Sequence, residues 1–437
     1  MECFDMLLVL PTTDDVVRSV RAQEAAPAYG LNVLATYLRL HGMCIFVLDE
    51  FMMNHDPVLK NKGWKEAITE LLKRCNVKSL GLSVLTNFVS TVRELIDAFH
   101  DMPIILGGVH ITSMDDDSIR LFGANLYLKG HINEQMLEEI DRLIDGGKPD
   151  QMIVVSRDDA PVCCPDYTQY LPYAPFKKIT SRISAGCRSA GCNFCCAYWL
   201  DPHPRVYPNI EDILCSLPLS EETSIEFHDS DFVSLITPDM VALLKEYLLF
   251  KPKVYCHARM ESITPDRLKL MSTINANFKI FVGLESASPA LCASMNKKRT
   301  NNAYEVFLHT LSECNFTNIT YGFFTLFGVP EETLEDIDET IAYLKSIERL
   351  LGTIDVRASI VNVIPGSVYY KRLVKSGVIN NNPWWDRELP LLTAVNGEEL
   401  NNALQYWNLY AEAFPQMKKH NSIFATLLNK LGVEIKN

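Results

Sequence analysis

Four cysteines lie within ten residues of one another and form the chemically most informative segment of the chain: Cys187, Cys192, Cys195 and Cys196. They follow a strand-like apolar run at 178–184, on a loop that carries a glycine. Thiolates packed this tightly on a flexible loop can point their sulfurs at a common centre, which suits an iron–sulfur cluster or a zinc ion. The identity of that metal settles most of the chemistry.

Zinc requires a particular ligand count. A structural zinc site needs four ligands in a tetrahedron. Adjacent cysteines such as Cys195 and Cys196 rarely both bind the same ion without strain. The fourth ligand of a zinc site would therefore have to be Cys163, Cys164 or Cys215. A cubane cluster held by only three thiolates leaves one iron open for a substrate. A spacing such as that of Cys187, Cys192 and Cys195 serves this second arrangement.

Composition limits the class of protein. The chain has 437 residues, of which 48% are hydrophobic and 22% charged, as in ordinary globular proteins of two or three domains. Its net charge of -13 argues against nucleic-acid binding and favours a small-molecule or peptide substrate. The absence of a long apolar run or a signal-like start predicts a cytoplasmic protein without membrane contact. Thirteen cysteines are then expected as reduced thiols, some of them metal ligands.

Residues 1–145 alternate apolar runs with amphipathic stretches, which predicts a doubly wound parallel sheet of Rossmann type. The expected strands are Asp5–Leu10, Met43–Leu48, Ser79–Val84, Pro103–Leu106 and Asn125–Leu128, and examples of the expected helices are Gly30–Leu40, Trp64–Arg74 and Val89–Phe99. The proline-rich segment 146–177 is predicted to be a linker.

Small residues follow several of these strands, at the edge where doubly wound sheets bind ligands. They are Thr12, Ser83, Gly107, Gly108 and Val109. They would let a large flat ligand approach the backbone. The alternative is that they simply form βα turns.

Residues 178–375 repeat the alternation six times, which predicts a partial (β/α)6 barrel. The expected strands are Lys178–Ser184, Ser224–Asp229, Lys253–Ala258, Phe278–Glu285, Ile319–Phe327 and Ile354–Val361. Three helices should begin at Thr237-Pro238, Thr264-Pro265 and Ser288-Pro289, because a hydroxyl N-cap before proline favours a helix start. Residues 376–437 are predicted to form a helical C-terminal region.

The residues after successive barrel strands should gather on one face, where barrel active sites lie. The cysteine loop follows the first strand, Asp229 ends the second, Arg259 follows the third and Glu285 ends the fourth. Polar groups spread over the whole segment are therefore expected to converge.

Taken together, these segments resemble the radical S-adenosylmethionine (SAM) superfamily, in particular the group with an N-terminal cobalamin-binding domain. The resemblance spans roughly residues 5–375. Besides the cysteines, it is carried by segments in both predicted domains: 30–39, Gly42, Gly107-Gly108, 226–232, 258–260, 283–286, 295–297, 327–333 and 364–367.

The resemblance implies a [4Fe–4S] cluster on three cysteines, with SAM chelated to the open iron and cleaved to a 5'-deoxyadenosyl radical. It assigns Cys187, Cys192 and Cys195 to the metal, with Cys196 as a spare thiol that packs or acts near the substrate. It places Phe194, Asp229, Arg259, Glu285 and Ser286 at SAM. For two of these residues the alternative is a mutual Arg259–Glu285 salt bridge.

The chain departs from the family in two places. Four residues, instead of the usual three, separate Cys187 from Cys192. The Asp-x-His-x-x-Gly motif that supplies a cobalt ligand in many cobalamin domains is missing, since His55 comes too late after its strand; His110 and His131 are other candidates near strand ends. The implied cobalamin contacts are Thr12, Ser83, Gly107, Gly108 and Val109.

The leading hypothesis is a cobalamin-dependent radical SAM methyltransferase that acts on an unactivated carbon of a small metabolite or peptide. An external electron donor such as a flavodoxin or ferredoxin would serve it. The alternative is cyclisation, rearrangement or another C–H functionalisation without methyl transfer, which the missing motif favours. A more remote alternative is a zinc-stabilised binding protein without catalysis. The sequence does not identify the substrate.

Overall fold

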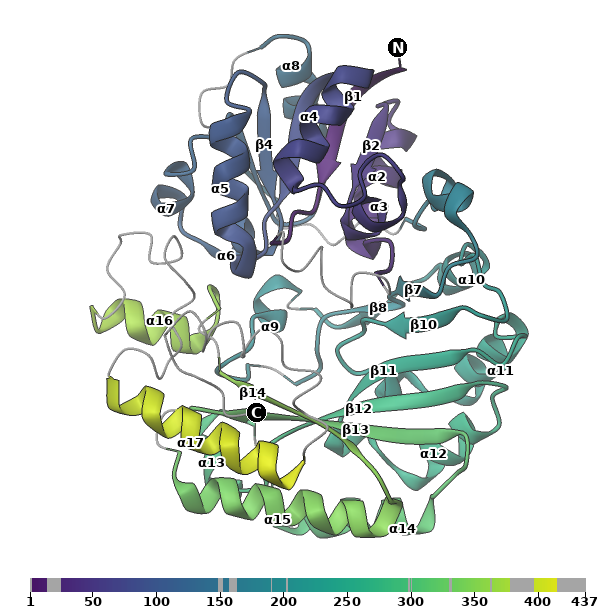
Figure 1. Ribbon diagram of the computed structural model, residues 1–437. Helices are drawn as coiled ribbons and strands as arrows, with labels where there is room; N and C mark the ends of the chain where they lie inside the picture. Colours follow the sequence, from purple (N-terminus) through teal and green to yellow (C-terminus); the bar gives the residue numbers. More distant parts are fainter. Residues whose placement is uncertain are drawn as a thin grey trace. The chain divides into compact units, whose positions relative to one another are not determined.

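The computed structural model describes most of the chain, and its compact parts fall into two units (Figure 1). The described residues are 2–13, 25–147, 152–156, 163–189, 191–201, 203–297, 299, 301–329, 332–361, 364–377 and 397–414. Unit 1 comprises Met1–Gly186, Cys196–Glu226 and Val374–Leu389, and unit 2 comprises Cys187–Cys195, Phe227–Leu373 and Pro390–Asn437. Each unit is built around parallel β-structure, which confirms the predicted mixed α/β class.

The first sheet has six parallel strands in the order β2-β1-β3-β4-β5-β6. The strands are β1 (Glu2–Val9), β2 (Ile45–Leu48), β3 (Cys75–Ser83), β4 (Ile104–Gly107), β5 (Leu126–Lys129) and β6 (Met152–Val155). The register aligns Leu8 with Val47 and with Gly81. All five strands predicted in the first 145 residues are present.

Helices connect these strands and bury both faces of the sheet. They are α2 (Tyr29–Leu40), α3 (Glu50–His55), α4 (Trp64–Arg74), α5 (Val89–Ala98), α6 (Val109–Ser113), α7 (Asp116–Arg120) and α8 (Glu134–Ile144), with a 3-10 turn η2 (Thr86–Phe88). Met6 and Leu8 of β1 pack in one core with α2 and α8. Leu7 and Val9 point to the opposite face, because side chains alternate along a strand, and they are equally buried.

The segment predicted to be a linker is in part folded onto unit 1, which corrects that expectation. The apolar run Met152–Val155 forms β6 and pairs with β5. The 3-10 helix η3 (Thr168–Tyr173) follows, and its Tyr170 hydroxyl donates to the buried Asp49 carboxylate at 2.9 Å. Prolines indicated an irregular path here, but the apolar and aromatic residues between them have partners in unit 1 that lie far away in sequence.

The second sheet has six strands in the sequential order β14-β13-β12-β11-β10-β7 that successive βα units produce. The strands are β7 (Lys178–Ser181), β10 (Ser224–Phe227), β11 (Lys253–Arg259), β12 (Asn277–Glu285), β13 (Ile319–Phe327) and β14 (Asp355–Ile360). The run expected to reach Ser184 stops at Ser181. A separate two-residue strand, β8 (Ser184–Ala185), instead pairs antiparallel with β9 (Arg205–Val206).

Three of the helices that accompany this sheet begin where the hydroxyl-proline pairs predicted. The elements are α9 (Ala197–Leu200), α10 (Ile210–Cys215), η4 (Phe232–Leu235), α11 (Pro238–Tyr247), η5 (Met260–Ser262), α12 (Pro265–Ser272), α13 (Pro289–Ser294), α14 (Asn301–Glu313), α15 (Leu334–Leu351) and α16 (Val368–Lys375). Thr237, Thr264 and Ser288 each accept a backbone N–H of the first helical turn through their hydroxyl groups. The three predicted helix starts are confirmed.

The predicted helical C-terminal region contains α17 (Gly397–Ala413), while 378–396 and 415–437 lie outside the described residues. The Tyr410 ring of α17 lies 6.1 Å from that of Phe327 on β13. No helix in the described part of the chain is long and apolar enough to span a membrane. All thirteen cysteines fall in described segments, and no disulfide joins them.

Candidate functional site

The cysteine loop of unit 2 is held by hydrogen bonds to the end of α13 and to the segment that follows it. The backbone N–H of Asn193 donates to Met295 O at 2.9 Å, and its side-chain amide donates to Ser294 O at 2.6 Å. The Asn296 amide donates in return to Gly191 O at 2.7 Å. Gly191 has a φ of 84°, a conformation that glycine adopts without strain. The loop is therefore fixed at its centre by residues about a hundred positions away.

Cys192 lies beside charged groups of this same segment. Burial raises the pKa of its thiol, and the nearby Lys297 ammonium opposes that rise, while Glu285 and Cys187 add to it. Among the residues that the structure describes, no group of three or more His, Cys, Asp or Glu side chains is arranged to hold a metal ion. The chemistry of the donor set fits an iron–sulfur cluster, and the assignment of Cys187, Cys192 and Cys195 as ligands stays a prediction.

The two residues next to the third cysteine differ in their surroundings. Phe194 packs against the apolar cluster that includes Leu291, Met295 and Tyr369, so its ring helps to anchor the loop. Cys196 is half-buried, and burial raises the pKa of its thiol above the usual value. A protonated thiol is the less nucleophilic form, which favours packing over catalysis for the spare cysteine.

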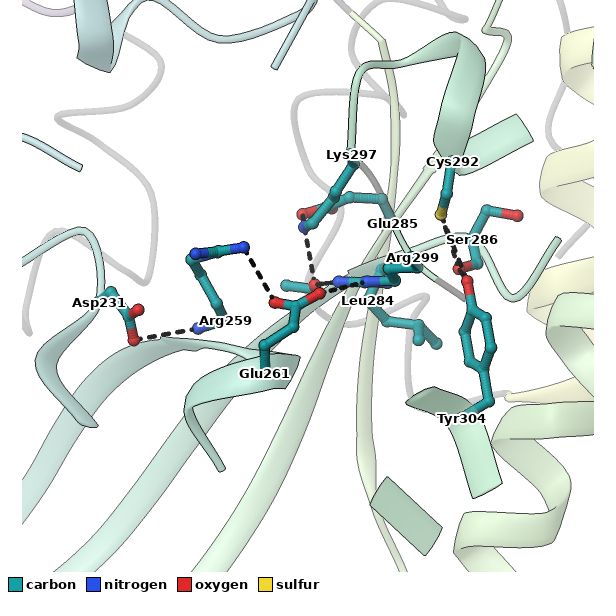
Figure 2. Close-up of polar contacts among 11 residues, drawn as sticks. Asp231, Arg259, Glu261, Leu284, Glu285, Ser286, Cys292, Lys297, Arg299 and Tyr304 are labelled. Atoms are coloured by element: carbon teal, nitrogen blue, oxygen red, sulfur yellow. Dashed lines mark hydrogen bonds and ion pairs between the residues drawn. The ribbon is translucent and has the colours of Figure 1, made fainter. Parts of the chain in front are cut away.

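Glu285 ends β12 in a strained conformation and is paired with Lys297 (Figure 2). Its φ is 60°, uncommon for a residue with a side chain, and the β12–β13 register shifts between Gly283 and Glu285. The Lys297 ammonium lies 2.5 Å from Glu285 Oε1 and donates to Gly283 O at 2.8 Å. The side chains of Glu285 and Lys297 are only 11% and 7% exposed, so water has little access to this ion pair.

Arg259 pairs with Glu261, and therefore the predicted alternative of an Arg259–Glu285 salt bridge is wrong. The Arg259 guanidinium lies 3.3 Å from Glu261, two residues further along, whereas Glu285 is taken by a lysine from beyond α13. Arg259 Nε is buried without a hydrogen-bond partner among the described residues. A buried donor of this kind carries an energetic cost unless a further group accepts from it.

Arg299 holds the end of β12 in place through hydrogen bonds to its backbone. Its fully buried side chain donates to the carbonyl oxygens of Gly283, at 2.6 Å, and Leu284, and its Nε lies 2.9 Å from Glu261 Oε1. Burial would raise the pKa of the Glu261 carboxyl, but the Arg299 charge lowers it below its usual value. Figure 2 shows the resulting chain of charged groups from Asp231 to Lys297.

Two aspartates lie just beyond β10. Asp229 is fully buried, two residues past the strand end, and its charge adds to burial in raising the pKa of the Cys256 thiol on β11. Asp231 accepts from the Arg259 backbone N–H at 3.3 Å and from the Ser262 hydroxyl at 2.6 Å. Burial nevertheless raises the pKa of Asp231. Asp231 thereby joins the ends of β10 and β11.

Ser286 holds helices in place through its hydroxyl group. That oxygen lies 3.1 Å from Thr340 Oγ1 on α15 and accepts from the Ser288 backbone N–H at 3.0 Å. The carbonyl oxygen of Ser286 accepts from the Cys292 thiol and the Tyr304 hydroxyl at 3.3 and 3.1 Å. The predicted SAM contact through Ser286 remains a prediction, and the contacts present are structural.

The carboxyl edge of the first sheet brings Ser83, Gly107 and Gly108 together. Val84 N donates to Gly107 O at 2.8 Å. Gly108 has a φ of 95°, and a Cβ built there would lie 2.8 Å from Val84 N. Gly108 is therefore small because the backbone that follows the neighbouring strand β3 passes against it, as the βα-turn alternative predicts. Thr12 is buried at the end of β1, and Val109 begins α6.

The three histidines considered as cobalt ligands are each engaged inside unit 1. His55 bonds Phe51 O at 2.9 Å and stacks on the Phe51 ring. His110 is fully buried 3.1 Å from Thr86 Oγ1, and desolvation lowers its pKa to about 4. His131 Nε2 lies 2.9 Å from Asp201; burial would raise the pKa of that carboxyl, but its partners lower it to about 2.

Comparisons with known proteins add little to this geometry. No protein-family model and no curated protein matches the chain. Among solved structures, one similar chain is the coproporphyrinogen III oxidase HemN from Escherichia coli, described as a radical SAM enzyme. The two are 15% identical over 54% of this chain and 52% of that one, with a TM-score of 0.37. The match thus spans about half of HemN, and at this TM-score it carries no argument.

Sequence reasoning missed several charged groups of the site. The sequence patterns gave no role to Lys297 and Glu332, although both lie in segments that carry the resemblance. They gave none to Glu261 and Arg299 either. Glu332 accepts from the N–H groups of Gly328 and Val329, just beyond β13, and desolvation raises its pKa to about 8. For Glu261 and Glu332 the available signal was a charged residue shortly after a predicted strand end, whereas Lys297 and Arg299 lie far from any strand end in sequence.

Proposed function

We propose that this chain is a radical SAM enzyme, with a [4Fe–4S] cluster on Cys187, Cys192 and Cys195. One observation carries the proposal. Hydrogen bonds join the cysteine loop to the segment 294–297. The Lys297 ammonium of that segment forms an ion pair with Glu285 at the end of β12. Potential metal ligands and the charged end of a sheet therefore belong to one assembled structure.

The charged groups at this edge match the polar parts of SAM. Glu285 already pairs with an ammonium group, that of Lys297, at 2.5 Å, so its carboxylate is suited to the kind of cation that an amino acid presents. The buried Arg259 Nε has a donor to spare for a carboxylate. We propose that both groups anchor SAM, with Asp229, Phe194 and Ser286 as further contacts.

When bound, the reduced cluster and SAM supply the electron transfer and carbon–sulfur cleavage that this class of enzyme uses. The chain's own residues position and shield them. Asn193 and Asn296 fix the loop, and Arg299 holds the strand end that presents Glu285. Electrons would come from an external donor such as a flavodoxin or ferredoxin, and the substrate would be a small molecule or peptide.

Anaerobic purification and reconstitution with iron and sulfide test the proposal. With dithionite and SAM, the wild-type chain should contain about four irons and four sulfides per chain, as a [4Fe–4S] cluster requires, and should release 5'-deoxyadenosine. Cys192→Ala should lose both, and Cys215→Ala, which removes an exposed thiol in α10, should lose neither. Zinc without iron or sulfide would overturn the proposal and favour the metal-stabilised binding protein.

The finer proposal is cobalamin-dependent methylation of an unactivated carbon. Its support is the parallel sheet of unit 1, whose carboxyl edge is where such folds bind ligands. The residues at that edge fit poorly, since Val84 takes the space beside Gly108 and His131 is bound by Asp201.

These same contacts favour the second candidate, radical C–H functionalisation without methyl transfer. A titration with hydroxocobalamin, followed by its visible spectrum, separates the two. A spectral shift, together with S-adenosylhomocysteine and 5'-deoxyadenosine as products, supports methylation. No shift and 5'-deoxyadenosine alone support the second candidate.

A further inference from the structure

The four strands β11–β14 of unit 2 present two very different faces. Every second residue is fully buried against helices, and the Phe323 ring of β13, for example, lies 6.3 Å from that of Phe307 on α14. The alternate residues form the opposite face. Polar and aromatic side chains of that face gather in one cluster: His257, Lys279, Phe281, Phe324, Asp355 and Arg357.

Two aromatic rings form the floor of this cluster. The rings of Phe281 and Phe324 stack with centroids 5.3 Å apart, and His257 lies 5.7 Å from Phe324. Gly322 makes room for the arrangement, because a Cβ there would lie 2.6 Å from the Phe281 ring. The Arg357 guanidinium lies 4.0 Å above the Phe281 centroid. A flat cation is thus held over a flat apolar surface.

The charges of the cluster do not balance. Lys279 Nζ lies 2.6 Å from Asp355, and Arg357 lies 3.5 Å from the same carboxylate oxygen. Two cations therefore share one anion, and the lysine holds it more closely. Arg357 is 38% exposed, and its Nε is buried without a hydrogen-bond partner among the described residues. A partly exposed guanidinium that shares its counter-ion with a lysine is suited to bind an oxyanion.

We infer that this face of β11–β14 binds the oxyanion of a planar small molecule, a carboxylate or phosphate on Arg357 with the flat part against the partly exposed Phe324, because the Phe281 ring beneath Arg357 is itself buried. The binding is independent of the chemistry proposed above. Its meaning as substrate recognition rests on the proposed function. His257 and Arg259 face the same side of β11 two residues apart, about 7 Å along the strand. A molecule anchored at Arg357 can extend from there toward the strand ends that carry Glu285.

Saturation-transfer NMR on the full-length chain tests this with three probes of similar shape. Benzoate and phenyl phosphate should both bind, and the tighter of the two identifies the anion as carboxylate or phosphate. The cation benzamidine should not bind. Arg357→Gln should weaken anion binding about tenfold or more, because a charged hydrogen bond is lost. Arg349→Gln, on an exposed arginine of α15, should bind as the wild type does.

A second variant guards against misfolding of the first. Arg357→Lys keeps the charge but not the planar fork, so it should weaken binding less than Arg357→Gln does. Equal binding of benzamidine, unchanged affinity in Arg357→Gln, or no binding of either anion would overturn the inference. Iron content and 5'-deoxyadenosine release are measured separately. Anion binding without SAM cleavage would support the anion site and contradict the proposed reaction. SAM cleavage without anion binding would support the reaction and contradict the site.

Discussion

The carboxyl edges of the two sheets use residues of opposite kinds. At the first sheet the edge carries small residues, and neighbouring backbone fills the space beside them, as Val84 does at Gly108. At the second sheet the strand ends carry partly or fully buried ionisable groups: Arg259, Glu285 and the nearby Glu332. Packing explains why Gly108 is small. It does not explain why the Glu285–Lys297 ion pair is kept from water in the second set, since burying charge costs free energy.

Backbone strain points to the same edge. Glu285 has a positive φ beside a register shift, at a cost on the order of 1–3 kcal/mol that the surroundings must offset. Gly108 has a positive φ as well, but glycine adopts it without that cost. Only the second edge therefore combines strain with buried charge, which is the combination expected of a functional site.

The largest expected effect comes from breaking the buried pair at the second edge. Lys297→Met leaves the Glu285 carboxylate buried without its cation and should lower the free energy of unfolding by about 3–5 kcal/mol. Lys78→Met is the matched change in unit 1, where Lys78 lies 2.7 Å from Asp5 but is 48% exposed, and it should cost less than about 1 kcal/mol. Urea unfolding measures both.

A double variant shows whether unpaired charge is the cause. Adding Glu285→Gln to Lys297→Met removes the orphaned carboxylate and should restore much of the lost stability. If Lys297→Met and Lys78→Met lower the free energy of unfolding equally, burial does not distinguish the two edges. The same conclusion follows if the double variant is less stable than Lys297→Met.

The next effect concerns pH. The Glu332 carboxyl has its pKa raised from 4.5 to about 8 by desolvation, so between these values the folded state keeps a proton that the unfolded state has lost. Stability should therefore fall as pH rises through this range and level off above pH 8. Relative to Glu332→Gln, the wild type should lose on the order of a few kcal/mol between pH 5 and 8.

Glu335→Gln is the control for that pH dependence. Glu335 is exposed in the first turn of α15, three residues from Glu332. This variant should keep the wild-type pH dependence of urea unfolding. Parallel curves for the wild type and Glu332→Gln would show that the Glu332 carboxyl is charged in the folded protein.

The smallest effect comes from the glycines of the first edge. Gly108→Ala forces a Cβ to within 2.8 Å of Val84 N at a positive φ and should cost about 2 kcal/mol. Gly107→Ala meets nothing nearer than Leu128 O at 3.8 Å and should change stability by less than about 1 kcal/mol. Urea unfolding of both variants checks this, and equal effects would contradict the packing role of Gly108.

Much of the fold was predictable because its determinants are local. Thr237 and Thr264 cap helices through groups three residues away, and the predicted helix Trp64–Arg74 has the bounds that its apolar spacing indicates. The segment 146–177 was misjudged because its partners are distant: β6 pairs with β5, and Tyr170 bonds Asp49, 121 positions earlier. Local composition does not report such contacts.

The sequence by itself determined most of the strands, three helix starts and the group of four cysteines, because each depends on neighbours within a few residues. Only the tertiary structure decided which charges pair. Glu285 takes Lys297 rather than Arg259, and Arg357 lies over Phe281, 76 positions away on another strand. Strand register and the paths of the connecting segments set these pairings, and the pattern of residue types along the chain leaves several equally plausible partners for each charge.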